Sequence, residues 1–243
     1  MLMMGAMYQL TPVLLNCEPV PARYSVDQWA IYTIGISLFV VGMNDHWLMG
    51  LGLGGSGIEV GIAFFLINLA RRIRSRGTWN ITAWFFVAAL GYLAMTLIMG
   101  GLLVLRCTTG SPSFANALPL HLTIALGGWF GLLVTGASYR LWAMFGRRHH
   151  EPRYWSWTWV SANLAIVCLA LGDILDAPAF TAIGWIVQLA AFAFYGADIA
   201  VGGLFDRRTM KDPALRTLVP SLVFLTAWEA LGSLAIFDRQ GSL

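Results

Sequence analysis

The chain has 243 residues, of which 58% are hydrophobic and only 11% are charged, and its mean hydropathy is +0.70. Soluble domains are roughly 45–50% apolar and 25% charged, so this composition excludes an ordinary soluble fold. The net charge of +3 comes from basic clusters beside apolar runs. Such clusters are typical of membrane-flanking loops and give no support for a nucleic-acid partner.

Eight apolar runs follow one another along the chain: 1–15, 29–42, 47–70, 79–105, 118–145, 157–172, 180–204 and 218–237. A bilayer core holds no water to satisfy backbone polar groups, so a spanning run must be a helix or part of a closed barrel. The long runs show no alternation of apolar and polar residues, which excludes barrel strands. The sequence therefore predicts an all-α, polytopic transmembrane helical bundle of about eight spans, with the lipid bilayer as its first partner.

The first run, 1–15, is shorter than the roughly 20 residues that a helix needs to cross a bilayer. It also begins with apolar residues and has no polar flank before it. We therefore expect the first span to be truncated.

Arginine and lysine gather in every second connection between the runs. These connections hold 12 of the 15 basic residues: Arg23; Arg71, Arg72, Arg74 and Arg76; Arg147, Arg148 and Arg153; Arg207, Arg208, Lys211 and Arg216. The positive-inside rule assigns them to the cytoplasmic side of a bacterial inner membrane. Both ends of the chain are then expected outside.

An internal repeat runs through the chain at a nearly constant offset. Residues 5–10 (GAMYQL) match residues 136–141 (GASYRL) at four of six positions, at an offset of 131. Two further matches keep the order: Tyr24 and Trp29 with Tyr154 and Trp159 at an offset of 130, and Gly57, Ala63 and Phe65 with Gly184, Ala190 and Phe192 at an offset of 127. The pattern predicts two tandem four-helix repeats, residues 1–116 and 117–243, the first incomplete at its N-terminus. Because each repeat has an even number of spans, the repeats are parallel.

His121 is the only histidine inside a predicted span, and it lies near the outer end of that span. Ionisable groups within a membrane are costly and usually functional. A neutral imidazole is a common ligand of haem iron and of copper. The sequence leaves two interpretations open: a cofactor or metal ligand, or an interfacial histidine that hydrogen-bonds to a neighbour or to water.

The stretch from His121 to residues 136–139 (GASY) resembles the second helix of subunit I in the heme–copper oxidase superfamily, which includes the large subunit of nitric oxide reductase. Residues 5–12, which end in Pro12, are similar to the cytoplasmic end of the same helix. The resemblance implies that His121 binds haem b or copper near the outer face, for electron transfer or for haem or metal handling. A partner ligand would come from a segment before Met1.

Two departures limit what the resemblance implies. The other histidines, His46, His149 and His150, lie in loops or at span ends, so no histidine cluster is present for the copper of an oxidase centre. Ala143 also stands where the family pattern has a proline. An oxygen-reducing enzyme is therefore not implied, and no catalytic residue is assigned.

Four charged residues fall inside the predicted spans. Glu59 and Glu229 lie near the midpoints of their runs, where proton relay or cation binding would justify a buried carboxyl group. The alternative is a protonated glutamate that stabilises a helix contact. Asp198 and Arg140 lie near the ends of their helices, where a local ion pair or a side chain that snorkels to water is expected.

Two outer loops carry acidic residues and a histidine: Asp45 and His46 in one, Asp173 and Asp176 in the other. They are compatible with a cation-attracting mouth or a weak metal site, but the positive-inside bias alone also leaves acidic residues outside. Besides the cofactor protein, two functions stay open: a proton- or cation-coupled transporter, and a structural or assembly subunit of a respiratory complex. Other membrane subunits or a redox partner would then bind the chain.

Overall fold

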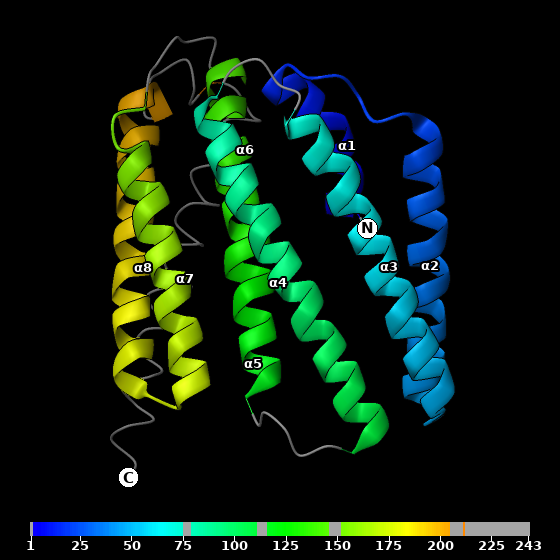
Figure 1. Ribbon diagram of the computed structural model, residues 1–243. Coiled ribbons are helices and arrows are strands. Elements are labelled where there is room, and N and C mark those ends of the chain that lie inside the picture. The colour runs from blue at the N-terminus through cyan, green and yellow to red at the C-terminus, as the bar shows by residue number, and fades with distance from the viewer. Residues whose placement is uncertain (1, 75–78, 111–115, 146–151, 205–210, 212–243) are drawn as a thin grey trace. The chain divides into compact units, whose positions relative to one another are not determined.

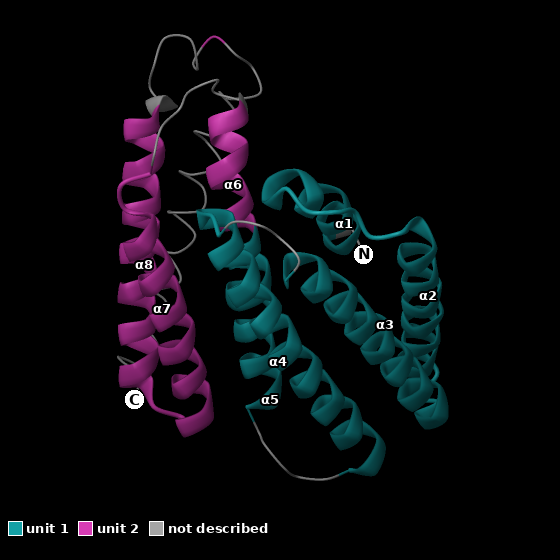
Figure 2. Cartoon of the chain, turned by 45° about the horizontal axis from the view of Figure 1, so that its top comes forward, with its two compact units in different colours: residues 1–133 teal, residues 134–243 magenta. Residues whose placement is uncertain are grey.

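The computed structural model describes residues 2–74, 79–110, 116–145, 152–204 and 211. Every regular element in these ranges is a helix (Figure 1), which confirms the all-α prediction. The chain divides into two compact units, Met1–Leu133 and Val134–Leu243 (Figure 2).

Unit 1 contains α1 (Leu2–Leu15), α2 (Ala22–Asn44), α3 (Leu48–Arg74), α4 (Ile81–Thr109), α5 (Ala117–Leu122) and the π-helix η1 (Thr123–Gly131). Unit 2 contains nearly all of α6 (Leu132–Phe145), with α7 (Trp155–Leu175), α8 (Pro178–Ile199) and the π-helix η2 (Ala200–Leu204). The segments α5, η1 and α6 follow one another without a break, so the boundary between the units falls inside a continuous helix.

Six helices in the described ranges are long and apolar enough to cross a membrane: α2, α3, α4, the helix Ala117–Met144, α7, and Pro178–Gly202. Large apolar side chains such as Ile34 and Met49 are exposed on them, at 62% and 66%. Contact with lipid accounts for such a surface, which would associate in water. The protein is thus a multi-pass membrane protein. The 14 residues of α1 extend about 21 Å, and the predicted run 218–237 lies outside the described residues.

Glycines bring α2 and α3 into backbone contact. A Cβ atom added to Gly54 would lie 2.6 Å from the Cα atom of Phe39, and one added to Gly42 would lie 2.9 Å from the Cα atom of Leu51. No larger residue fits at either position unless a helix moves. The two helices therefore form a hairpin whose interface consists largely of backbone atoms.

The α7–α8 hairpin of unit 2 has corresponding contacts. A Cβ atom on Gly172 would lie 3.0 Å from the backbone nitrogen of Thr181, and one on Gly184 would lie 2.7 Å from the Cγ atom of Leu169. In its place within the hairpin, Gly184 resembles Gly54 more than Gly57, the residue with which the sequence comparison pairs it.

The turns of the two hairpins also correspond. His46 and Asp176 have positive φ angles of 53° and 48°, which side chains other than glycine adopt in few places. The amide of Trp47 donates to the carbonyl of Gly42 at 2.9 Å, and the amide of Ala177 donates to that of Gly172 at 3.1 Å. Both turns thus satisfy a helix-end carbonyl in the same way.

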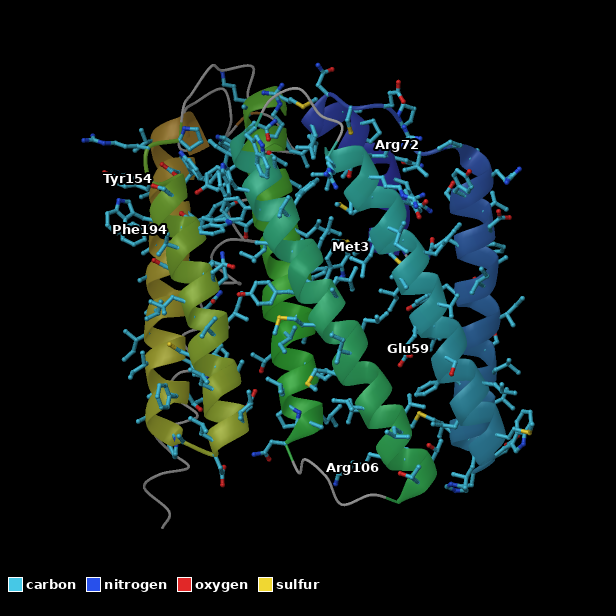
Figure 3. All side chains as sticks on the ribbon, viewed as in Figure 1. Met3, Glu59, Arg72, Arg106, Tyr154 and Phe194 are labelled. Atoms are coloured by element: carbon cyan, nitrogen blue, oxygen red, sulfur yellow. The ribbon has the colours of Figure 1, made fainter. Side chains whose placement is uncertain are left out.

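The opposite ends of the hairpins share an aromatic contact. The rings of Tyr24 and Phe64 lie 6.1 Å apart, and those of Tyr154 and Phe194 lie 6.2 Å apart (Figure 3). An arginine precedes each tyrosine and lies over its ring, at 5.5 Å in unit 1 and 5.9 Å in unit 2. Both ends of each hairpin are therefore built alike.

Asn80 ties the start of α4 to the end of α1. Its Oδ1 accepts from the amide of Ala83 at 2.9 Å, and its Nδ2 donates to the carbonyl of Leu14 at 3.1 Å. We expect Asn80→Ala to lower the free energy of unfolding by about 1–2 kcal/mol, because both bonds are lost. Unfolding by SDS in mixed micelles measures this. Asn80→Asp keeps only the bond to the Ala83 amide, so its stability should lie between those of the wild type and Asn80→Ala. An Asn80→Ala protein as stable as the wild type would contradict this role.

Candidate functional site

His121 lies one turn into α5 and packs against α4. A Cβ atom on Gly100 would lie 3.5 Å from the Cε1 atom of His121, an ordinary van der Waals distance, so the ring lies directly over this residue. The imidazole also lies beside the backbone carbonyl of Thr96. Its Nδ1 atom is buried and makes no hydrogen bond within the described residues. The ring is thus held between two helices with one nitrogen turned toward α4.

The π-helix η1 begins two residues after His121 and runs for nine residues. Such segments widen the helix by one residue per turn and often occur at functional sites. Gly128 within it faces the ring of Tyr92 on α4. Tyr92, Thr96 and Gly100 are spaced four residues apart, so they line the one face of α4 that meets α5 and η1.

Glu59 of α3 packs against Gly101 of α4, the residue that follows Gly100. Its carboxyl group lies against Gly101, where a Cβ atom would come within 3.2 Å of the Cδ atom of Glu59 (Figure 3). The side chain is half-buried. Two residues that the sequence singled out separately, Glu59 and His121, thus lie against the neighbouring glycines Gly101 and Gly100.

The predicted outer residues lie at the hairpin turns. Asp45 and His46 are exposed in the α2–α3 turn, and the side-chain amide of Asn44 donates to Asp45 at 2.9 Å. Asp173 is half-buried near the end of α7, and Asp176 is exposed after it. In the part of the chain that the structure describes, no three His, Cys, Asp or Glu side chains are placed to hold a metal ion together. Glu229, His149 and His150 lie outside the described residues.

Asp198 in unit 2 is a buried group whose role sequence reasoning missed. It is only 2% exposed, so the expectation of a side chain that snorkels to water is wrong. Its Oδ1 accepts from the backbone amides of Arg153 and Tyr154 at 2.7 and 2.8 Å, and its Oδ2 accepts from the Tyr139 hydroxyl at 3.1 Å. Thr158 Oγ1 lies 3.0 Å from the same hydroxyl oxygen. The carboxyl group therefore caps the start of α7.

A related pair occupies the matching place in unit 1. Tyr8 of α1 lies beside Asn68 of α3, and Asn68 precedes Asp198 by the same offset that separates Tyr24 from Tyr154. The side-chain nitrogen of Asn68 is buried and makes no hydrogen bond within the described residues. The repeated Gly-Ala-x-Tyr motif could have pointed to both pairs. Its tyrosine is Tyr8, beside Asn68, in the first copy and Tyr139, beside Asp198, in the second.

Two sets of residues stand out in the described structure. His121 and Glu59 lie separately against neighbouring glycines of α4, and Asp198 accepts from three donors. Comparison of the chain with family models, with curated proteins and with solved structures finds no match in any of the three.

Proposed function

We propose that the protein lies in a bacterial inner membrane and binds haem b or a copper ion through His121, near the outer face, for electron transfer or for haem or metal handling. The observation that carries this proposal is the position of His121. It is a histidine within a spanning helix, packed on Gly100, with its ring beside the backbone carbonyl of Thr96. Intramembrane histidines are rare and usually bind something.

The chemistry of His121 suits such a group, because a neutral imidazole is a common ligand of haem iron and of copper. Its ring packs over Gly100. The Thr96 carbonyl lies next to the ring and would fix its orientation, as partners of ligating histidines commonly do. Haem iron or copper would supply one-electron chemistry. The chain itself would supply the ligand, its orientation and a lipid-shielded setting.

The resemblance to the second helix of heme–copper oxidase subunit I supports the same proposal. His121 and Tyr139 lie on one continuous helix, near its opposite ends. Two tandem parallel repeats, residues 1–116 and 117–243, are supported by the contacts that recur in the two hairpins. Arginine-rich connections on the cytoplasmic side would place the end that carries His121 outside.

An absorption spectrum of the detergent-purified full chain tests the proposal. We expect sharp haem bands after reduction with dithionite, or copper by elemental analysis, and loss of nearly all bound cofactor in His121→Ala. His46→Ala is the matched control, because His46 is exposed at a hairpin turn. A wild-type protein without haem or copper, or a His121→Ala protein with an unchanged spectrum, would overturn the proposal.

Glu59 supports a second candidate, a proton- or cation-coupled transporter. The specific observation is that its half-buried carboxyl group contacts Gly101 between two spanning helices. Sites of secondary transporters commonly lie near the midplane between helices. The same spectrum bears on the choice between the two candidates, because a protein that binds neither haem nor copper would remove the first and leave the second.

A further inference from the structure

A pocket of about 380 Å³ opens where α2 begins and α3 ends, in unit 1. Its lining includes Arg71, Arg72 and Asn68 from α3, Pro21 and Tyr24 from the start of α2, and Glu18. These residues lie at the ends of spanning helices, where the membrane core meets water. The pocket is therefore accessible to headgroups as well as to solutes.

The lining is rich in hydrogen-bond donors and positive charge. Arg71 is exposed at the pocket, and Arg72 pairs with Glu18 at 2.9 Å. That pair is a weak restraint, because the Glu18 side chain is 83% exposed and exposed ion pairs contribute little. Asn68, which is only 7% exposed, also lines the pocket, and its side chain lies beside Tyr8 of α1.

The start of α2 adds a further preference for an anion. Its N-cap is Pro21, which makes no side-chain hydrogen bond to the first turn, and that turn contains no acidic residue. The free amides of a helix start and the helix dipole both favour a negative charge.

In unit 2 the place that corresponds to this pocket is occupied by a carboxylate of the chain itself. There Asp198 stands in the place of Asn68, and its carboxylate accepts from two amides at the start of α7. The cavity beside it holds only about 10 Å³, roughly the room of one water molecule. Unit 2 thus fills the site with its own carboxylate, whereas unit 1 has a neutral amide, two arginines and an open pocket.

We propose that the unit 1 pocket binds the phosphate group of an anionic ligand, either an acidic phospholipid headgroup or a soluble phosphate compound. Arg71 and Arg72 bind the phosphate oxygens in a charge-assisted way, and the neutral Asn68 in the lining tolerates the negative charge. The position at the membrane surface favours the headgroup, since basic pockets at helix ends recruit acidic lipids. This site is independent of His121.

The test uses the delipidated full chain in neutral detergent with three probes: dioctanoyl phosphatidylglycerol, dioctanoyl phosphatidylcholine and inorganic phosphate, all at matched ionic strength. Thermal stabilisation as a function of probe concentration gives the apparent affinity. We expect phosphatidylglycerol to bind and Arg71→Gln to weaken its binding at least about tenfold, as expected for the loss of a charged hydrogen bond. Arg74→Gln is the matched control, because Arg74 is exposed on the same helix and does not line the pocket.

A second variant gives unit 1 the aspartate that unit 2 has at the corresponding position. Asn68→Asp is nearly isosteric and places a carboxylate where the phosphate would bind, so it should abolish binding of both anionic probes while the protein stays folded. Competition between phosphatidylglycerol and inorganic phosphate indicates that the phosphate group alone is recognised; binding of the lipid alone indicates the headgroup. Either result supports the site. Absence of binding to any probe, or equal losses in Arg71→Gln and Arg74→Gln, would overturn it.

Discussion

Gly54→Ala is expected to separate α2 from α3 and to lower the free energy of unfolding by about 3 kcal/mol. The added Cβ atom would lie 2.6 Å from the Cα atom of Phe39. Backbone atoms cannot rotate away as a side-chain tip can, so one helix has to shift along its length. SDS titration in mixed micelles measures the loss.

Two alanine substitutions serve as comparisons for Gly54→Ala. Gly91→Ala places its methyl group where nothing lies within 4 Å, and it should cause no loss, since alanine favours helix. Gly184→Ala meets side-chain atoms of Leu169 first, with the backbone nitrogen of Leu169 farther away at 3.0 Å; the side chain can change rotamer, so the cost should be smaller, about 2 kcal/mol. If all three variants unfolded alike, backbone contact would not be what holds the hairpins together.

Asp198→Ala is expected to destabilise unit 2 by about 3–5 kcal/mol. It leaves the amides of Arg153 and Tyr154 without their acceptor in a partly buried place, while the hydroxyl of Tyr139 can still donate to Thr158. Each unsatisfied buried donor costs about 1–3 kcal/mol, and the start of α7 also loses its cap. The same titration, monitored by tryptophan fluorescence, reports the change.

Two milder variants measure how much each hydrogen bond of Asp198 contributes to the free energy of unfolding. Tyr139→Phe removes one donor and its oxygen together, so it should cost about 1 kcal/mol. Asp198→Asn keeps the oxygen that accepts from the two amides but places an amide group against the Tyr139 hydroxyl. Its loss of unfolding free energy should lie between those of Tyr139→Phe and Asp198→Ala. A stable Asp198→Ala protein would show that water or another group satisfies these donors.

Hydropathy predicted the helices well and their ends less well. The second run was predicted to begin at residue 29, whereas α2 begins at Ala22. Arg23 and Asp27 are polar and therefore interrupt an apolar count, yet they lie on the first turns of the helix. The π-helix η1 had no recognisable sequence signal, because apolar residues suit hydrogen bonds of either spacing.

The sequence predicted which residues belong to the candidate site but not how these residues are arranged. Composition singled out His121 and Glu59, since ionisable residues are few in these spans. That both lie against neighbouring glycines of α4 depends on how three helices pair, which hydropathy does not encode. Asp198 was misjudged for the same reason, because its acceptor role depends on amides 44 and 45 residues earlier in the chain.

The glycine contacts also show that one pattern of helix pairing accepts different partners. The glycines have the same spacing in both hairpins, at 42 and 54 and at 172 and 184, while the residues they meet differ: Leu51 against Thr181, and Phe39 against Leu169. Gly42 and Gly54 meet mainly backbone atoms, whereas Gly172 and Gly184 meet side-chain atoms first. The spacing of the glycines therefore sets where the two helices of each hairpin approach, whichever side chains lie opposite.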